Sequence, residues 1–164
     1  MLASFVLATG VVVSQTPPVP AATAASAPST RTRVVLLGTG TPGPDPDRSG
    51  PATAIVVDDR AYLIDFGPGV VRRAEAAALK RELPAVEPGN LKVAFVTHLH
   101  SDHIIGLPDL YLTGWGAQGR KTPFRVWGPS GTKDMMEHLQ RAFDFDIHIR
   151  RDVDEKFVKE GIEV

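Results

Sequence analysis

Three of the five histidines in this 164-residue chain fall within a seven-residue segment, Thr97-His98-Leu99-His100-Ser101-Asp102-His103. We call residues 97–103 the histidine motif. It directly follows residues 93–96, a short apolar run typical of a buried strand. A strand that ends in imidazoles and a carboxylate constrains the fold, because these side chains then gather at one end of a sheet. The spacing and the preceding strand argue against a chance cluster on a surface loop.

The spacing of the motif predicts metal binding. Side chains alternate along an extended segment, so His98 and His100 project to one side and can close on one metal ion. Asp102 and His103 come after the chain turns and can face a second ion. Two ions about 3.5–4 Å apart form the usual clamp for hydrolysis by a metal-bound hydroxide. Because the chain has no cysteine, imidazole and carboxylate are the donors, and these suit zinc, with manganese or iron as alternatives.

Asp65 ends a second apolar run, directly before Phe66 and two glycines. A buried carboxylate needs hydrogen-bonding partners. We therefore predict that Asp65 stands behind the metal ligands and fixes their loop by hydrogen bonds. The alternative is that it only caps a turn.

Apolar patterns predict the elements that surround the motif. The predicted strands cover residues 33–37, 54–57, 61–64, 93–96 and 124–127, and the predicted helices cover residues 70–82, 104–112 and 133–143. The loop over 44–51 either overlooks a site or is a solvated connector. Ser130 or Thr132 is expected to cap the last helix. His138 and His148 are interpreted as surface residues, with His148 on the exposed face of a strand.

Residues 1–30 contain no charged side chain. Residues 2–13 are mostly apolar but shorter than the roughly 20 residues that span a bilayer, and small-residue sites such as Ala22-Thr23-Ala24 follow. This pattern predicts a signal peptide over 1–30, a domain over 31–164, no stable membrane span and a periplasmic or secreted location. Since no Lys or Arg precedes the apolar stretch, a disordered leader and a cytoplasmic location are the alternative.

The histidine motif has the form THxHxDH and resembles the ligand signature of the metallo-β-lactamase superfamily. The stretches 37–41, 63–67 and 126–131 resemble the branch that holds ribonuclease Z and secreted arylsulfatase-like or phosphodiesterase-like hydrolases. The resemblance implies an α/β (α+β) fold, an αββα sandwich with its site at one edge. It makes His98 and His100 ligands of one metal and Asp102 and His103 ligands of the other. Asp102 is also implied as the catalytic residue that holds the attacking water.

The family's complete ligand set adds a later histidine, a bridging aspartate and a last histidine, which lie downstream of the region matched by this chain. A catalytic zinc usually has three protein ligands and a water, whereas each metal here would have two. Half of a sandwich also leaves an apolar sheet face uncovered. We therefore expect residues 31–164 to be the N-terminal part of a longer, C-terminally truncated domain.

The leading functional hypothesis is a dizinc hydrolase of phosphoester, sulfate ester or related ester bonds in a small molecule. A formal net charge of −1 and the lack of a strong basic patch disfavour nucleic acid as a partner, and export disfavours tRNA processing. One alternative is a truncated, inactive metal-binding or interaction fragment that pairs with another copy as a homodimer. A di-iron oxidoreductase of this fold is disfavoured, because its usual second ligand is Glu, where His100 stands.

Overall fold

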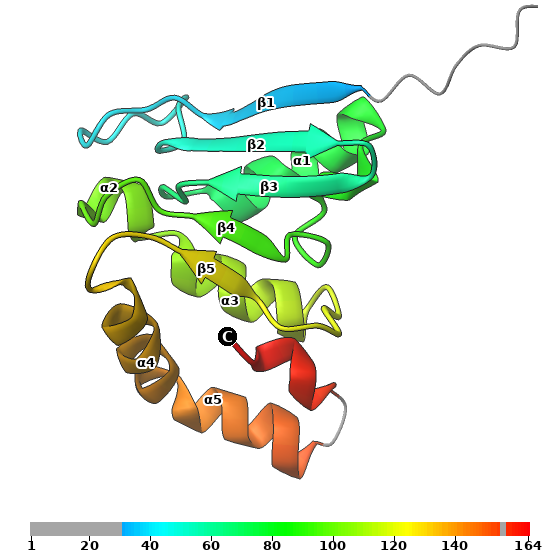
Figure 1. The fold of residues 1–164 in the computed structure, drawn as a ribbon, viewed down its shortest axis with the longest axis vertical. Helices are drawn as coiled ribbons and strands as arrows, with labels where there is room; N and C mark the ends of the chain where they lie inside the picture. The colour runs from blue at the N-terminus through cyan, green and yellow to red at the C-terminus, as the bar shows by residue number, and fades with distance from the viewer. Residues whose placement is uncertain (1–30, 155–156) are drawn as a thin grey trace, which may run out of the picture.

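The computed structural model describes residues 31–154 and 157–164, so the predicted leader lies outside the described residues. The fold is built on one five-stranded sheet in the order β1-β2-β3-β4-β5 (Figure 1). Strands β1 to β3 are antiparallel, whereas β4 and β5 run parallel to β3. The strands are β1 (Thr32–Gly38), β2 (Ala52–Val57), β3 (Arg60–Ile64), β4 (Val93–Phe95) and β5 (Arg125–Trp127).

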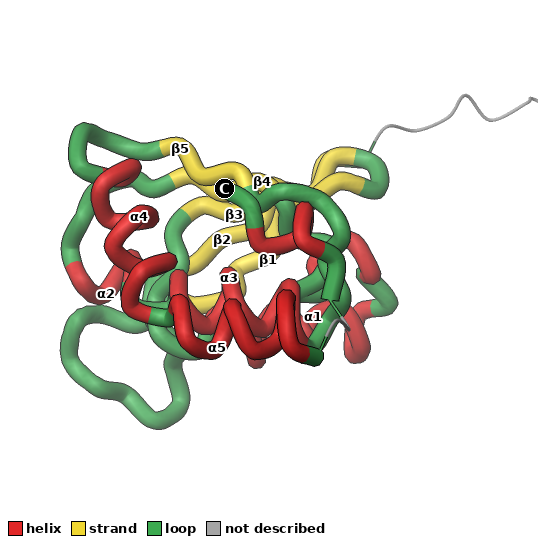
Figure 2. Tube along the Cα trace, turned by 90° about the horizontal axis from the view of Figure 1, so that it is seen from below, coloured by secondary structure: helices red, strands yellow, loops and turns green. Residues whose placement is uncertain are grey.

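Helices α1, α3 and α5 lie on the same side of the sheet (Figure 2). The α-helices are α1 (Val70–Arg81), α2 (Ser101–Ile104), α3 (Leu107–Gly116), α4 (Thr132–Ala142) and α5 (Asp144–His148). Shorter helical segments are η1 (Pro84–Val86), η2 (Ile149–Val153) and η3 (Lys159–Ile162). The mixed α/β fold predicted from the sequence is confirmed. No helix in the described part of the chain is long and apolar enough to cross a bilayer.

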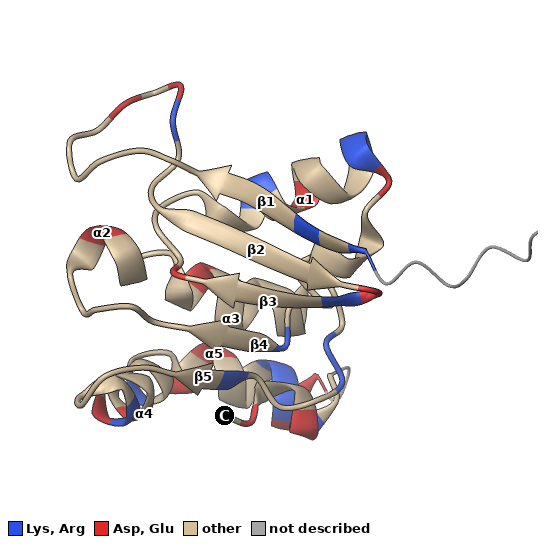
Figure 3. Ribbon diagram, turned by 45° about the horizontal axis from the view of Figure 1, so that its top comes forward, with Lys and Arg blue, Asp and Glu red and all other residues tan. Residues whose placement is uncertain are grey.

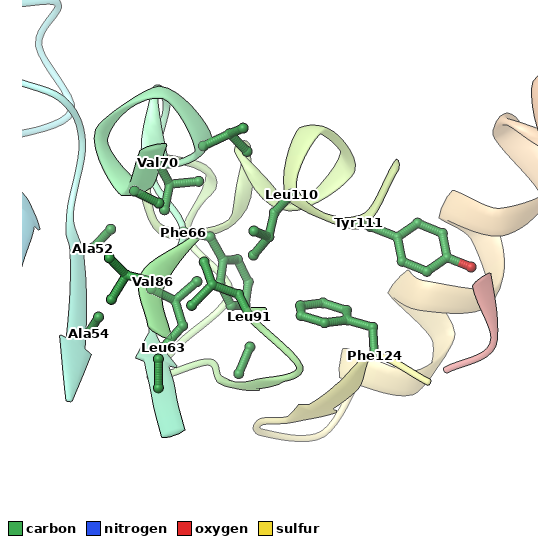
Figure 4. Close-up of a cluster of buried hydrophobic side chains, with 14 of the residues drawn as sticks. Ala52, Ala54, Leu63, Phe66, Val70, Val86, Leu91, Leu110, Tyr111 and Phe124 are labelled. Carbon is green, nitrogen blue, oxygen red and sulfur yellow. The ribbon is translucent and has the colours of Figure 1, made fainter. Parts of the chain in front are cut away.

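The two faces of the sheet differ in how they are covered. Alternate strand residues such as Ala54 and Leu63 are fully buried and meet Phe66 and Leu110 in the core (Figure 4). On the other face the strand register aligns Leu36, Thr53, Ile64, Phe95 and Trp127 in one row. Within this row Leu36 is 67% exposed, and the exposed rings of Phe95 and Trp127 stack with their centres 5.5 Å apart. Within the described residues this row forms an apolar face without a covering layer, as expected for part of a sandwich.

Arg120 is buried, with 2% of its surface exposed. Its guanidinium donates to the carbonyl oxygens of Tyr111 at 2.7 Å and Gly161 at 3.2 Å, and lies 4.8 Å from the centre of the Phe124 ring. Burial lowers the pKa of Arg120 to about 10, so it stays charged at neutral pH. The Tyr111 hydroxyl donates to the carbonyl oxygen of Ile162. Arg120 and Tyr111 thereby join α3 to the η3 segment.

Two local predictions differ from the structure. His148 lies at the end of α5 and not in a strand, because Ile147 is buried at helical spacing and His148 Nδ1 lies 2.9 Å from Asp152 Oδ2, four residues on. Helix α4 begins after Gly131, which has a φ of 98°. Neither Ser130 nor Thr132 therefore caps α4 through its side chain, and the Thr132 hydroxyl donates to Pro129 O at 2.8 Å.

Candidate metal centre

The histidine motif begins where β4 ends and continues into α2. The backbone N–H of Val96 donates to Trp127 O at 2.7 Å, which holds the end of β4 beside β5. The turn into α2 brings the three imidazoles together. The His98 ring centre lies 4.6 Å from that of His100 and 4.1 Å from that of His103. The fold therefore gathers the three predicted imidazoles at one end of the sheet.

Asp102 and His103 have the spacing of two ligands on one ion. His103 Nε2 lies 3.5 Å from Asp102 Oδ2. Two ligand atoms that are each about 2.1 Å from a tetrahedral zinc lie about 3.4 Å apart. Both side chains are partly exposed, at 20% for His103 and 16% for Asp102, so an ion from solution can reach them.

Asp65 is buried behind the imidazoles, with 6% of its surface exposed. Its Oδ1 accepts from the Thr97 backbone N–H at 2.8 Å, and its Oδ2 accepts from the Thr97 hydroxyl at 2.8 Å. His103 Nδ1 also lies 2.8 Å from Oδ2. Asp65 has a φ of 57°, a left-handed conformation that is costly for most residues. These contacts hold the loop after β3 against the histidine motif.

The hydrogen bonds favour one tautomer of the imidazoles. A carboxylate oxygen accepts hydrogen bonds, so the contact with Asp65 favours the His103 tautomer that donates from Nδ1. The Thr97 hydroxyl gives its one proton to Asp65, and its oxygen, 3.0 Å from His98 Nδ1, therefore accepts from that ring. A ring that donates from Nδ1 in this way has Nε2 free, and a neutral ring of that form can bind a metal. Sequence reasoning assigned no role to Thr97, although the residue stands in the motif.

Two glycines allow the loop after β3 to pack closely against α2. The Phe66 N–H donates to His103 O at 2.7 Å, and the Gly106 N–H donates to Phe66 O at 2.8 Å. A Cβ on Gly67 would lie 2.6 Å from Asp102 O, and one on Gly106 would lie 2.5 Å from Gly67 O. A side chain at either position would therefore push the Asp65 loop away from α2.

A surface hollow of about 680 Å³ opens beside Asp102. It is lined on one side by Ser101 and Ile105 of the α2 region, and on the other by much of the loop between β1 and β2, including Arg48 and Ser49. Of the two readings of the 44–51 loop, the structure favours the one in which this loop overlooks the site.

The described side chains supply only part of a complete metal centre. Within residues 31–154 and 157–164, no three His, Asp or Glu side chains are placed so that together they could hold one ion. The two remaining histidines lie elsewhere, both exposed: His138 Nδ1 is 2.7 Å from Asp134 O in α4, and His148 contacts Asp152. The candidate donors in the described residues therefore lie in pairs and not in sets of three.

The chain belongs to the metallo-beta-lactamase superfamily, whose family model matches residues 45–163. It is 39% identical over 105 residues to ribonuclease Z of Mycolicibacterium gilvum, a match that covers 63% of this chain and 34% of that protein. Ribonuclease Z of Mycobacterium bovis is 40% identical to this chain over 105 residues, a match that covers 63% of this chain and 35% of that protein. The crystal structure of human tRNase Z, short form, aligns with a TM-score of 0.54 and 30% identity, covering 69% of this chain and 39% of that one.

These relatives confirm the family and the ribonuclease Z side of the predicted resemblance. The chain spans about a third of the length of the curated relatives that it matches. The expectation of a small-molecule ester substrate, with nucleic acid disfavoured, is wrong: the relatives are named for the cleavage of RNA and tRNA. The expectation failed because it depended on net charge and on the lack of a basic run in the sequence, and neither reports how the fold gathers charges.

Proposed function

We propose that this chain carries the N-terminal ligands of a zinc-dependent hydrolase that cleaves phosphodiester bonds in RNA. The observation that carries the proposal is the buried Asp65, which orients His103 directly and His98 through Thr97. A carboxylate behind ligating histidines is the usual way to fix the ring and the tautomer at a metal. The identity to ribonuclease Z proteins supports RNA as the substrate class.

The donor set fits a pair of zinc ions. His98 and His100 would hold one ion, and Asp102 and His103 the other, with manganese or iron as alternatives. When bound, the ions supply a water acidic enough to attack near neutral pH and positive charge for the oxyanion that develops. Since each pair falls short of the usual three protein ligands, we expect the affinity of this chain for zinc to be low.

Side chains of this chain would orient the metal ligands and the attacking water. Asp65 keeps a proton on Nδ1 of His103 and so leaves Nε2 able to bind. The partly exposed Asp102 carboxylate lies at the hollow, where it can accept a hydrogen bond from the attacking water and aim it at phosphorus. Because the hollow lies at the surface, it can accommodate a phosphodiester bond inside an RNA strand as well as one at the end of the strand.

Cleavage of a 5′-labelled RNA oligonucleotide in the presence of Zn²⁺ or Mn²⁺ tests the proposal. We expect metal-dependent cleavage that is abolished by a chelator and lost in Asp102→Asn. The matched control is Asp109→Asn, an exposed carboxylate in the first turn of α3. Cleavage that survives Asp102→Asn would contradict the assignment of this site.

A second candidate function is metal binding without turnover. The observation that favours it is the lack of a three-ligand site within the described residues. Zinc that binds the wild-type chain and is lost in His98→Ala/His103→Ala, together with no cleavage of RNA under any metal, would support this candidate over catalysis.

We also propose that residues 1–30 are an export leader ahead of a domain that begins at residue 31, with a periplasmic or secreted location; the RNA substrate would then be one met outside the cytoplasm. The absence of charged side chains in this segment supports the proposal. The mass of the protein isolated from its native host tests it: we expect cleavage near Ala24 or after the second small-residue site, Ala25-Ser26-Ala27, and an intact N-terminus would contradict it.

A further inference from the structure

A groove of about 600 Å³ runs along the β1 side of the molecule, between β1 and α1. Its lining includes an unusual number of cations. We define the basic groove by these cations, all of them exposed: Arg33, Arg48, Arg73, Lys80 and Arg81. Figure 3 shows the basic residues around β1, α1 and the loop that follows β1. Because β1 is at the edge of the described sheet, no neighbouring strand fills this side of the groove.

The basic groove is assembled from three separate stretches of the sequence. Arg33 comes from β1, Arg48 from the loop after it, and the others from α1. On α1, Arg73 and Lys80 are seven residues apart, so they share one helix face at a separation of about 10 Å. Ala76 and Ala77 lie between them in the lining, and their small side chains leave space for a ligand.

The positive charge in the basic groove is balanced only in part. Among the residues that line it, Asp47 is the one carboxylate. Arg48 lies 3.7 Å from Asp45, an exposed pair that contributes little to stability and exchanges readily for another anion. Arg73 donates to Ser49 Oγ and to Asp47 O, both at 3.1 Å, and thereby holds the loop in place. The groove therefore offers several cations to an anionic ligand.

The basic groove and the hollow beside Asp102 share two lining residues, Arg48 and Ser49. The loop between β1 and β2 therefore borders both, and a polymer bound in the hollow can reach the basic groove along this loop.

We propose that the basic groove binds the sugar–phosphate backbone of the RNA strand whose scissile bond lies beside Asp102. This inference rests on the proposed function for the substrate class. Arginine forks match phosphate oxygens in geometry as well as charge. Contacts of this kind position a strand without reading its bases, so binding is independent of sequence and sensitive to salt.

The test measures binding of a fluorescent single-stranded RNA by anisotropy in the presence of a chelator, so that cleavage does not interfere. The variant is Arg33→Gln/Lys80→Gln/Arg81→Gln, which spares Arg73 and its hydrogen bonds to the loop. Each phosphate contact contributes about 0.7 to the slope of log K against log salt for single strands, so the slope should become shallower by about 2. At about 0.1 M salt we expect affinity to fall at least roughly tenfold.

The matched control removes the same charge away from the groove, with Lys121→Gln/Lys133→Gln/Arg141→Gln, all exposed. We expect its affinity to fall less than twofold. Equal losses in the two variants, or no loss in the groove variant, would overturn the proposal, as would no RNA binding by the wild-type chain. Equal competition by poly-glutamate would also overturn it in favour of an acidic peptide.

Two further measurements keep the outcome interpretable. Circular dichroism checks that the groove variant is folded, and the single substitution Lys80→Glu replaces it if it is not. His98→Ala/His103→Ala should bind RNA like the wild-type chain while losing metal-dependent cleavage. If the wild-type chain binds RNA through the groove but never cleaves it, the proposed function fails and the groove assignment stands.

Discussion

Asp65 and Arg120 are both buried charged residues that join distant segments, but their partners differ. The Asp65 carboxylate accepts from the backbone and hydroxyl of Thr97 and contacts the His103 ring, all at 2.8 Å. Arg120 donates to main-chain carbonyls and lies against aromatic rings. A buried charge that contacts only main-chain carbonyls contributes to the fold. A buried charge that contacts an imidazole also leaves the second ring nitrogen free to contact another group. The difference distinguishes a buried charge with only structural partners from one that also contacts the histidine motif.

Arg120→Met should give the largest effect, and on stability alone. The substitution keeps much of the side-chain volume but leaves the buried carbonyls of Tyr111 and Gly161 without their donor, at a cost of about 3 kcal/mol. Urea denaturation followed by circular dichroism measures it. Lys121→Met, at the exposed neighbouring position, is the control and should change stability by under about 0.5 kcal/mol. A loss for Arg120→Met as small as that of the control would contradict the structural role.

Asp65→Asn should act mainly on metal binding. An amide at this position donates toward His103 Nδ1, and this favours the tautomer that carries its proton on Nε2, where the metal would bind. We expect zinc affinity to fall about 10–100-fold, as measured by competition with a chromophoric chelator. Asp59→Asn, in the exposed β2–β3 turn, is the control. Unchanged zinc affinity in Asp65→Asn would show that this carboxylate is only structural.

Thr97→Val should have a smaller effect in the same direction. It removes the hydroxyl between Asp65 Oδ2 and His98 Nδ1 while keeping the backbone N–H bond to Oδ1. One lost hydrogen bond of about 1 kcal/mol corresponds to roughly fivefold weaker zinc binding. Thr97→Ser should bind zinc with the wild-type affinity. A zinc affinity of Thr97→Ser as low as that of Thr97→Val would contradict the role given to the hydroxyl.

Arg120→Lys should give the smallest effect, visible as a change in pH dependence. Burial lowers the pKa of Arg120 to about 10, and the same burial would lower the pKa of a lysine at this position below its usual value. The folded variant then binds fewer protons than the unfolded chain at mildly alkaline pH, so its stability rises with pH. Between pH 7 and 8.5 we expect the variant to gain stability relative to the wild-type chain, which keeps its proton. Parallel pH profiles of the two proteins would contradict the burial argument.

The sequence predicted the grouping of the motif side chains with Asp65 better than the arrangement of the rest of the molecule. The motif side chains are neighbours in the chain, and Asp65 was recognisable as an acidic residue that ends an apolar strand. The role of Thr97 was not, because it depends on β3 and β4 lying side by side in the register that pairs Ile64 with Phe95. The strands and the α1 helix were predicted because apolar periodicity is a local property.

Features that depend on distant segments were missed. Arg120 is buried because Gly114 has no side chain, since a Cβ there would lie 2.5 Å from the guanidinium Nη1. The basic groove draws on positions from 33 to 81 that form no basic run in the sequence. His148 was assigned to a strand because alternating isoleucines over four residues fit a strand and a helix equally well.

Zinc retained after equilibrium dialysis, measured by elemental analysis, tests the central claim most directly. The comparison is between the wild-type chain, His98→Ala/His103→Ala and the control His138→Ala/His148→Ala, which changes the two histidines outside the motif. We predict that the wild-type chain and the control retain zinc equally and that the motif variant retains none above buffer. Equal zinc in the motif variant and the wild-type chain would contradict the metal site at the end of β4.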